Sequence, residues 1–168
     1  IVGDFMTAPA LSIQAHMNEI QVEDIFTRYD VRALPVVDDD NNVIGLVTYK
    51  EVASAKQRMW NKEQKRIRRE EEAEKRGVTI SDDEKKTIQD RRGSGTTVKA
   101  WMLQHVVTVV DSKTMAEVES ILLEDDVGCI PVVAEGTQKL IGMVTGTDLL
   151  RQHRYYASLH YHNPGFAD

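Results

Sequence analysis

An internal repeat is the feature of this chain that most constrains its fold. Residues 2–37 align without a gap on residues 98–133, and 10 of the 36 positions are identical. After a one-residue shift in a turn, the alignment resumes with residues 44–48 on residues 141–145. Units of about 55 residues are too small to bury an adequate core alone, so we expect the two repeats to pack against each other. Ligand pockets favour such seams, which makes the seam the first place to expect a site.

Each repeat shows the same succession of hydrophobic patterns and turn signals. A short strand precedes a helix whose start has the spacing of a capping box, Asn18 with Gln21 and Thr114 with Glu117. Two apolar strands joined by a polar turn follow, and then a second helix. The expected strands are residues 10–13, 34–37, 43–47, 106–110, 130–133 and 140–144. The sequence therefore predicts an α+β fold of two β-α-β-β-α repeats packed with pseudo-two-fold symmetry.

The segment between the repeats has a different composition from both. Of the 21 residues from 56 to 76, 14 are charged, so the apolar stripe is too narrow for a core helix although helix formers predominate. We expect this stretch to extend the preceding helix as far as Gly77, a short helix to follow over 81–91, and the whole insertion to be exposed and partly mobile. The predicted divisions are repeat one at 1–56, the insertion at 57–97, repeat two at 98–153 and a tail at 154–168.

Composition excludes several classes of protein. A net charge of −6 argues against general binding of nucleic acid or anionic membrane. Cys129 is the single cysteine and cannot form an internal disulfide, which indicates an intracellular compartment, either the cytoplasm or an organelle lumen such as the plastid. No run approaches the roughly 20 apolar residues that span a bilayer. The chain opens without methionine, so we expect it to be a fragment of a longer protein.

Two sequence motifs recur at equivalent positions in the repeats. Leu34-Pro35-Val36-Val37 is followed by residues 45–51, and residues 130–133 are followed by residues 142–148. The order, spacing and duplication of these motifs resemble those of the CBS domain, the cystathionine-β-synthase-type repeat. Two such domains in tandem form a Bateman module. The resemblance covers everything except the insertion and the tail. It implies a regulatory module with no catalytic residues.

The resemblance also implies a ligand and partners. The ligand is an adenine nucleotide (AMP, ADP or ATP), with S-adenosylmethionine less favoured, bound between the repeats. The partners are a second copy in a homodimer and an unidentified effector domain or protein. Two groups of host proteins resemble parts of the chain: stand-alone plant-type CBS-pair proteins that influence thioredoxins, and CBS pairs attached to tRNA nucleotidyltransferase-like enzymes. Both alternatives stay open.

The residues of repeat two support a nucleotide site on physical grounds. Thr145 ends a buried strand and Asp148 falls in the first turn of the next helix. A helix N-terminus favours phosphate, a carboxylate can accept hydrogen bonds from both ribose hydroxyls, and Gly146 lets a ligand approach closely. By the family's pattern, Asp148 holds the ribose and Thr145 a ribose or phosphate oxygen. The adenine is then expected near Met102, Leu103, Cys129, Ile130 and Pro131.

Repeat one departs from this pattern. Thr48 is present, but the acid is Glu51, one methylene longer, and Tyr49 stands where repeat two has glycine. Glu51 has more rotamer entropy to lose on binding, and Tyr49 adds bulk near the entrance or stacks on a ligand. We expect this second site to be weaker, altered in specificity or empty. Its expected residues are Thr48, Glu51, Met6, Thr7, Ala33, Leu34 and Pro35.

Simpler structural explanations compete with chemistry at several positions. Each threonine–acid pair could be a strand end followed by a helix-capping acid, and Cys129 is better explained as a small buried residue than as a redox centre. The acidic turn at 38–42 alternates like a calcium loop but lacks the glycine and glutamate such a loop requires. The three histidines near the C-terminus fit an amphipathic tail at least as well as a zinc site. We therefore expect no metal site.

Two alternative functions stay open beside nucleotide sensing. One is a ligand-free module for dimerisation or assembly. The other is an accessory role with RNA through the basic residues 62–69, although the acidic continuation at 70–74 favours a solvated charged helix.

Overall fold

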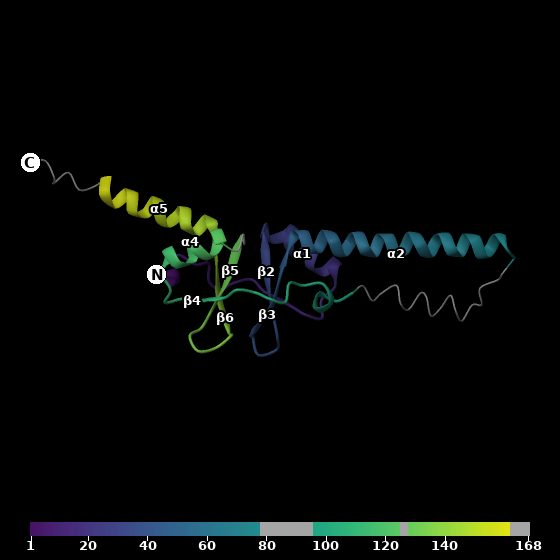
Figure 1. Ribbon diagram of the computed structural model, residues 1–168, viewed down its shortest axis with the longest axis horizontal. Coiled ribbons are helices and arrows are strands. Elements are labelled where there is room, and N and C mark those ends of the chain that lie inside the picture. Colours follow the sequence, from purple (N-terminus) through teal and green to yellow (C-terminus); the bar gives the residue numbers. More distant parts are fainter. Residues whose placement is uncertain (78–95, 125–127, 162–168) are drawn as a thin grey trace, which may run out of the picture. The chain divides into compact units, whose positions relative to one another are not determined.

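The computed structural model describes residues 1–77, 96–124 and 128–161. Within these residues the helices and strands follow the predicted order in both repeats (Figure 1). The strands form two three-stranded sheets, with orders β1-β2-β3 and β4-β5-β6. The prediction of an α+β fold made of two repeats is confirmed. The helix expected over 81–91 lies outside the described residues.

Repeat one begins with a 3-10 helix and ends in a long α-helix. Its elements are η1 (Val2–Asp4), β1 (Ile13–Gln14), α1 (Glu19–Tyr29), β2 (Ala33–Val37), β3 (Val43–Thr48) and α2 (Tyr49–Lys75). The capping box of α1 forms as predicted, because Asn18 Oδ1 accepts from the backbone N–H groups of Ile20 and Gln21 at 3.1 and 3.0 Å. Gln21 Oε1 accepts in return from the backbone N–H of Asn18 at 3.0 Å.

Repeat two repeats this succession with a shorter last helix. Its elements are η3 (Val98–Ala100), β4 (Val109–Val110), α4 (Met115–Glu124), β5 (Cys129–Val133), β6 (Leu140–Thr145) and α5 (Gly146–Tyr161). β4 pairs parallel to β5, and β5 pairs antiparallel to β6. The first strand of each repeat is shorter than predicted, with two residues in β1 and two in β4. In repeat two the reason is that β4 pairs with β5 only at Val109 and Val110.

The compact units of the fold do not coincide with the repeats. Unit 1 comprises Ile1–Ser12, Val37–Gly45 and His105–Asp168. Unit 2 comprises Ile13–Val36 and Leu46–Gln104. Each unit therefore combines the opening segment of one repeat with most of the other repeat.

Backbone hydrogen bonds in unit 1 fix the opening segment of the chain on repeat two. The N–H of Val2 donates to the carbonyl of Lys113 at 2.8 Å, and Thr7 exchanges two bonds with Met143 at 2.8 and 3.0 Å. Gly142 permits this close approach, because a Cβ at that position would lie 3.1 Å from the carbonyl oxygen of Thr7. The glycine is therefore required by packing rather than by an unusual backbone angle.

Unit 2 contains the equivalent arrangement. The N–H of Val98 donates to the carbonyl of Met17 at 2.8 Å. Leu103 exchanges two backbone bonds with Leu46, both at 2.9 Å. Leu103 is the counterpart of Thr7 in the repeat alignment, so both opening segments pair with the third strand of the other repeat.

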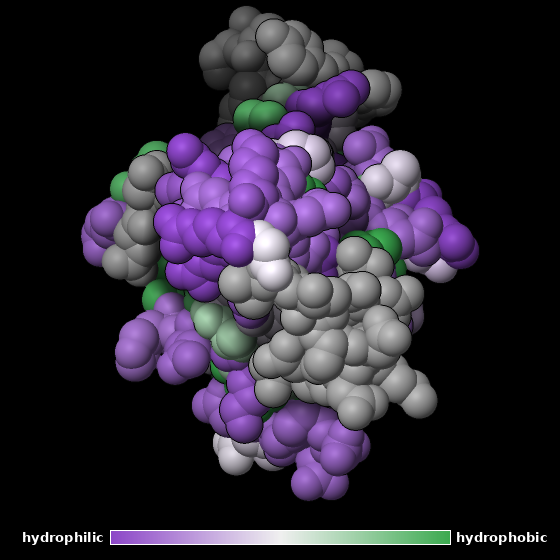
Figure 2. All heavy atoms as spheres, turned by 90° about the vertical axis from the view of Figure 1, so that its right-hand side faces the viewer, coloured by the Kyte–Doolittle hydropathy of each residue, from purple (hydrophilic) through white to green (hydrophobic). Residues whose placement is uncertain are grey.

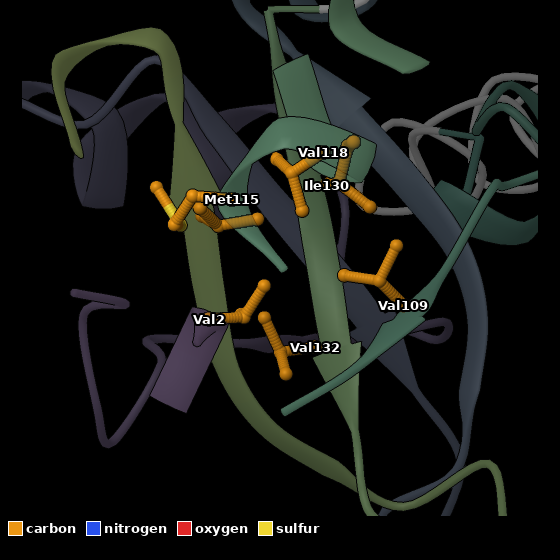
Figure 3. Packing of buried hydrophobic residues seen from close by; sticks show 7 residues of the cluster. Val2, Val109, Met115, Val118, Ile130 and Val132 are labelled. Carbon is orange, nitrogen blue, oxygen red and sulfur yellow. The ribbon is translucent and has the colours of Figure 1, made fainter. Parts of the chain in front are cut away.

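The core of unit 1 is assembled across these segments. Figure 3 shows its buried side chains converging from η1, α4 and the strands. The cluster consists of Val2, Val109, Met115, Val118, Ile130, Val132 and Val144. Burying each of these side chains contributes roughly 1.5–3 kcal/mol, so the opening segment is a structural part of this core through Val2.

Unit 2 has the equivalent apolar side chains but differs at one place. The buried counterparts are Val98, Ile13, Val22, Leu34, Val36 and Val47. At the position equivalent to Met115 stands Glu19, which is only 1% exposed. Both carboxylate oxygens of Glu19 are buried without a hydrogen-bond partner among the residues that the structure describes. A core position of unit 2 therefore holds an unsatisfied polar group.

Helix α2 continues well beyond the length of its counterpart α5. Its 27 residues span roughly 40 Å, and it ends just before Gly77, which has a φ of 71°. Ion pairs along its outer part join Arg66 to Glu63 and Glu70. The surface around this end of α2 is mostly hydrophilic (Figure 2). No helix within residues 1–77, 96–124 and 128–161 is long and apolar enough to cross a membrane.

Candidate functional site

Thr145 and Asp148 lie together where β6 ends and α5 begins. Oδ2 of Asp148 accepts from the backbone N–H and from the hydroxyl of Thr145, both at 2.8 Å. The carboxylate thereby closes the first turn of α5 as the acidic half of a capping box. The same bonds fix the orientation of the carboxylate. This orientation is compatible both with capping the helix and with binding a ligand.

The second oxygen of Asp148 faces a cation. Nη1 of Arg151 donates to Oδ1 at 3.0 Å, and the two side chains differ greatly in exposure, 62% for Arg151 and 3% for Asp148. The carboxylate is therefore nearly buried while its counter-ion remains mostly in water. Sequence reasoning did not single out Arg151, although its i, i+3 spacing from Asp148 is the signal that could have found it.

Unpaired backbone donors and open space adjoin this carboxylate. Within the described residues, the N–H groups of Gly146 and Thr147 at the start of α5 donate to no oxygen. Apart from its chain neighbours and the backbone of its own helix, a Cβ added at Gly146 would meet no atom of the described residues within 4 Å. The N-terminus of α5 thus offers two donors and the positive end of a helix dipole at an unobstructed position.

Repeat one forms the same local arrangement despite its longer acid. Oε2 of Glu51 accepts from the backbone N–H of Thr48 at 2.9 Å and from the Thr48 hydroxyl. The second oxygen of Glu51 has no partner among the described residues, and Ser54 occupies the position equivalent to Arg151. The Tyr49 ring packs edge-on against Phe26, with centroids 6.2 Å apart. The extra methylene of Glu51 therefore does not prevent the capping geometry.

The predicted adenine-slot residues of repeat two are mostly buried in β5. Cys129 pairs with Thr145 and Pro131 pairs with Met143 across the β5–β6 ladder. Ile130 has no exposed surface and belongs to the core of unit 1, so neither its side chain nor its backbone is open to a ligand in this structure. Burial raises the pKa of the Cys129 thiol to about 11, which keeps it protonated and unreactive near neutral pH.

The remaining predicted site residues are divided between the two units, and the opening-segment residues lie in the other unit from the one expected. Met6 and Thr7 were expected at the site of repeat one, and they lie in unit 1, which carries Thr145 and Asp148. Met102 and Leu103 were expected with Asp148, and they lie in unit 2, which carries Thr48 and Glu51. The predicted residues Ala33, Leu34 and Pro35 are in β2 and also belong to unit 2.

A groove on unit 2 was not anticipated from the sequence. It has a volume of about 330 Å³ and lies between α1 and α2. The exposed rings of Tyr49 and Trp60 belong to it, and a salt bridge joins Lys56 Nζ to Glu23 Oε1 at 2.6 Å. Its complete lining is Glu23, Tyr49, Val52, Ala53, Lys56, Gln57, Met59 and Trp60. The 11-residue spacing of the two aromatics, three helical turns, was the signal that could have revealed it.

Hydrogen bonds from its own residues stabilise the acidic turn at residues 38–42. Oδ1 of Asp38 accepts from the backbone N–H groups of Asp40 and Asn42 at 3.0 and 2.8 Å, and its other oxygen accepts from the Asn42 amide at 3.0 Å. These bonds hold the pKa of Asp38 below its usual value. Among the described side chains, no group of three or more His, Cys, Asp or Glu residues is placed to hold a metal. His162 lies outside the described residues.

A model of the CBS domain family matches residues 2–58 and residues 98–154. Those two segments make up more than half of the chain and coincide with the two repeats described above. The chain therefore belongs to the CBS domain family, as a tandem pair.

Several solved structures, CBS pairs among them, have the same fold. CBSX2 in complex with AMP is 23% identical, with a TM-score of 0.67, over 93% of this chain and 97% of that chain. AcuB from Vibrio cholerae is 18% identical, with a TM-score of 0.67, over 95% and 94% of the two chains. The CBS pair of MJ0100, in complex with 5′-methylthioadenosine and S-adenosyl-L-methionine, is 16% identical, with a TM-score of 0.64, over 93% and 97%. Because the sequence identities are this low, the similarity is evidence for a shared fold only.

Proposed function

We propose that this chain is a regulatory module that binds an adenine nucleotide of the AMP, ADP or ATP type and signals its presence to an attached domain or partner protein. The observation that carries the proposal is the Thr145–Asp148 arrangement, a nearly buried carboxylate beside free backbone donors. The solved CBS pairs with AMP and with S-adenosyl-L-methionine support an adenosine-containing ligand. The role is regulatory rather than catalytic.

Each group at the start of α5 has a distinct part in this proposal. Asp148 accepts hydrogen bonds from the vicinal hydroxyls of the ribose, and Thr145 holds the carboxylate in place. The N–H groups of Gly146 and Thr147 are available to a phosphate, whose negative charge the helix dipole favours. Met6, which belongs to the same unit as Asp148, is a further candidate to contact the ligand.

We propose a second, weaker site in repeat one. Thr48 and Glu51 have the capping geometry of their counterparts, but the longer acid loses more rotamer freedom when a ligand binds. Met102 and Leu103 belong to the same unit as Glu51 and are candidates to line this site. Titration should therefore resolve a strong and a weak binding event rather than two equal ones.

Isothermal titration of the purified chain with AMP tests the proposal. Asp148→Ala should weaken binding by about 1.5–3 kcal/mol, the range for a hydrogen bond to a charged group. Because Asp148 also caps α5, the matched control is Glu117→Ala, which removes the equivalent cap from α4 and leaves the site unchanged. The assignment is wrong if Asp148→Ala binds AMP like the wild type while remaining folded.

A ligand-free assembly module is the competing function, and one observation favours it. Tyr49 and Trp60 are both about 60% exposed and belong to the groove on unit 2, where a second copy or another partner could bind. The same titration separates the two functions. An assembly module would give no heat with AMP, ATP or S-adenosylmethionine at millimolar concentration.

A further inference from the structure

The pair formed by Asp148 and Arg151 joins a buried anion to an exposed cation. Oδ2 of Asp148 is occupied by two bonds from Thr145, whereas Oδ1 has Arg151 as its only hydrogen-bond donor within the described residues. The Arg151 side chain is 62% exposed, so water competes for its guanidinium. The Arg151 guanidinium can therefore reach another anion through water, whereas the carboxylate that it would leave stays buried.

The oxygen that Arg151 covers is the one a ribose would need. A diol that binds Oδ1 must displace the guanidinium, and a buried carboxylate then loses its counter-charge. A ligand that carries its own phosphate changes this balance, because the released guanidinium gains a new anionic partner that it can bind in a bidentate manner. An unphosphorylated nucleoside offers Arg151 no such partner.

From this geometry we infer that Arg151 determines specificity, and that the repeat-two site selects ligands with a 5′-phosphate over unphosphorylated adenosyl compounds. In the free protein Arg151 covers Asp148, and in the complex it turns to the phosphate near the start of α5. The inference rests on the proposed function, since it refines which adenosyl ligand the site accepts.

Repeat one provides an internal contrast. Thr48 and Glu51 reproduce the cap, but Ser54 stands where repeat two has Arg151. The free oxygen of Glu51 is covered by no cation among the described residues. The feature that we connect with phosphate selection is therefore present in one repeat and absent from the other, although the carboxylates have the same position.

The test compares AMP with adenosine, which share base and ribose and differ only in the phosphate. Dissociation constants are measured by calorimetry for the full chain and for Arg151→Gln. The wild type should bind AMP at least about tenfold more tightly than adenosine, and Arg151→Gln should raise the Kd for AMP by about tenfold, as expected for loss of one charge-assisted hydrogen bond. The Kd for adenosine should stay the same or fall, because nothing then competes for Asp148.

Arg154→Gln is the matched control, because it removes the same charge from the same helix and, among the described residues, no hydrogen bond or ion pair joins Arg154 to Asp148. It should leave both Kd values unchanged, and thermal unfolding verifies that each variant is folded. Equal effects of Arg151→Gln on AMP and adenosine, or an equal effect of Arg154→Gln on AMP, would overturn the inference alone. A wild type that binds neither compound would overturn the proposed function and this inference together.

Discussion

Unit 1 and unit 2 are built from equivalent segments, yet one core position holds Met115 in unit 1 and Glu19 in unit 2. Met115 is buried and packs among apolar side chains of the core of unit 1. Glu19 is as deeply buried, and within the described part of the chain neither of its oxygens has a hydrogen-bond partner. A buried polar group without a partner costs about 1–3 kcal/mol. At this position the core of unit 2 is therefore less favourable than the core of unit 1.

The caps of α1 and α4 also differ in charge, but here the charged side chain is in unit 1. The cap of α1 uses two neutral side chains, Asn18 and Gln21, whereas the equivalent cap of α4 uses Thr114 and the charged Glu117. Lys113 adds a further bond to Glu117 at 2.8 Å. Repetition has therefore preserved the geometry of the elements while the charges within them have changed.

The largest expected effect comes from placing the residue of unit 2 in unit 1. Met115→Glu should lower the free energy of unfolding by about 3 kcal/mol, because it removes a core side chain and buries an unpaired carboxylate. Urea denaturation followed by circular dichroism measures the change. Met115→Leu is the control and should cost less than about 1.5 kcal/mol. A loss below about 1 kcal/mol for Met115→Glu would mean that this position tolerates a carboxylate in either unit.

The reverse exchange should stabilise the protein by a smaller amount. Glu19→Met should raise the free energy of unfolding by about 1–2 kcal/mol, since it removes the unsatisfied carboxylate but also loses a favourable charge at the start of α1. The same denaturation assay applies, with Glu19→Gln as a control of similar size that keeps a polar group. If Glu19→Met destabilises the chain, the carboxylate has a stabilising interaction in solution and the comparison of the two cores is wrong.

The smallest expected effect is a loss of stability at low pH that comes from Glu117. Bonds from Lys113 and Thr114 lower the pKa of Glu117 from its ordinary value of 4.5 to about 2. A carboxylate with a lowered pKa in the folded state stabilises the fold above its unfolded pKa, and that contribution disappears as the pH falls from about 4.5 to about 2. The difference in thermal midpoint between the wild type and Glu117→Gln should thus be present at pH 7 and vanish near pH 2.

The neutral cap of α1 provides the control for this pH dependence. Gln21→Ala should lower the thermal midpoint by a similar amount at every pH, because Gln21 carries no titratable group. A pH-dependent loss for Gln21→Ala, or a constant one for Glu117→Gln, would remove the distinction between the two caps.

Local features of this fold were predictable because their causes are local. The capping boxes at Asn18 and Thr114 follow from side chains three residues apart, and the hairpins follow from apolar runs around polar turns. The Thr145–Asp148 contact was predictable for the same reason. The extra methylene of Glu51 does not prevent the cap, since a flexible side chain can fold back to it, and the weaker site expected in repeat one stays a prediction.

Long-range features were not predictable from patterns in one segment. Nothing near Thr7 indicates that it pairs with Met143 instead of a strand in its own repeat. Glu19 was not recognised as buried, because an acidic residue in the first turn of a helix is ordinary at an exposed position. Its alignment with Met115 was the available signal, since an apolar counterpart marks the position as part of the core.

The pairing of each opening segment with the other repeat bears on how the chain can fold during synthesis. Val2 is synthesised before β5 and β6, and its place in the core does not exist until those strands have been made. Repeat one likewise lacks Val98 and the pairing to Leu103 until the insertion has been translated. Neither half can be completed while the other is unfinished, so the nascent chain should acquire its native core late, in a step slowed by these long-range contacts.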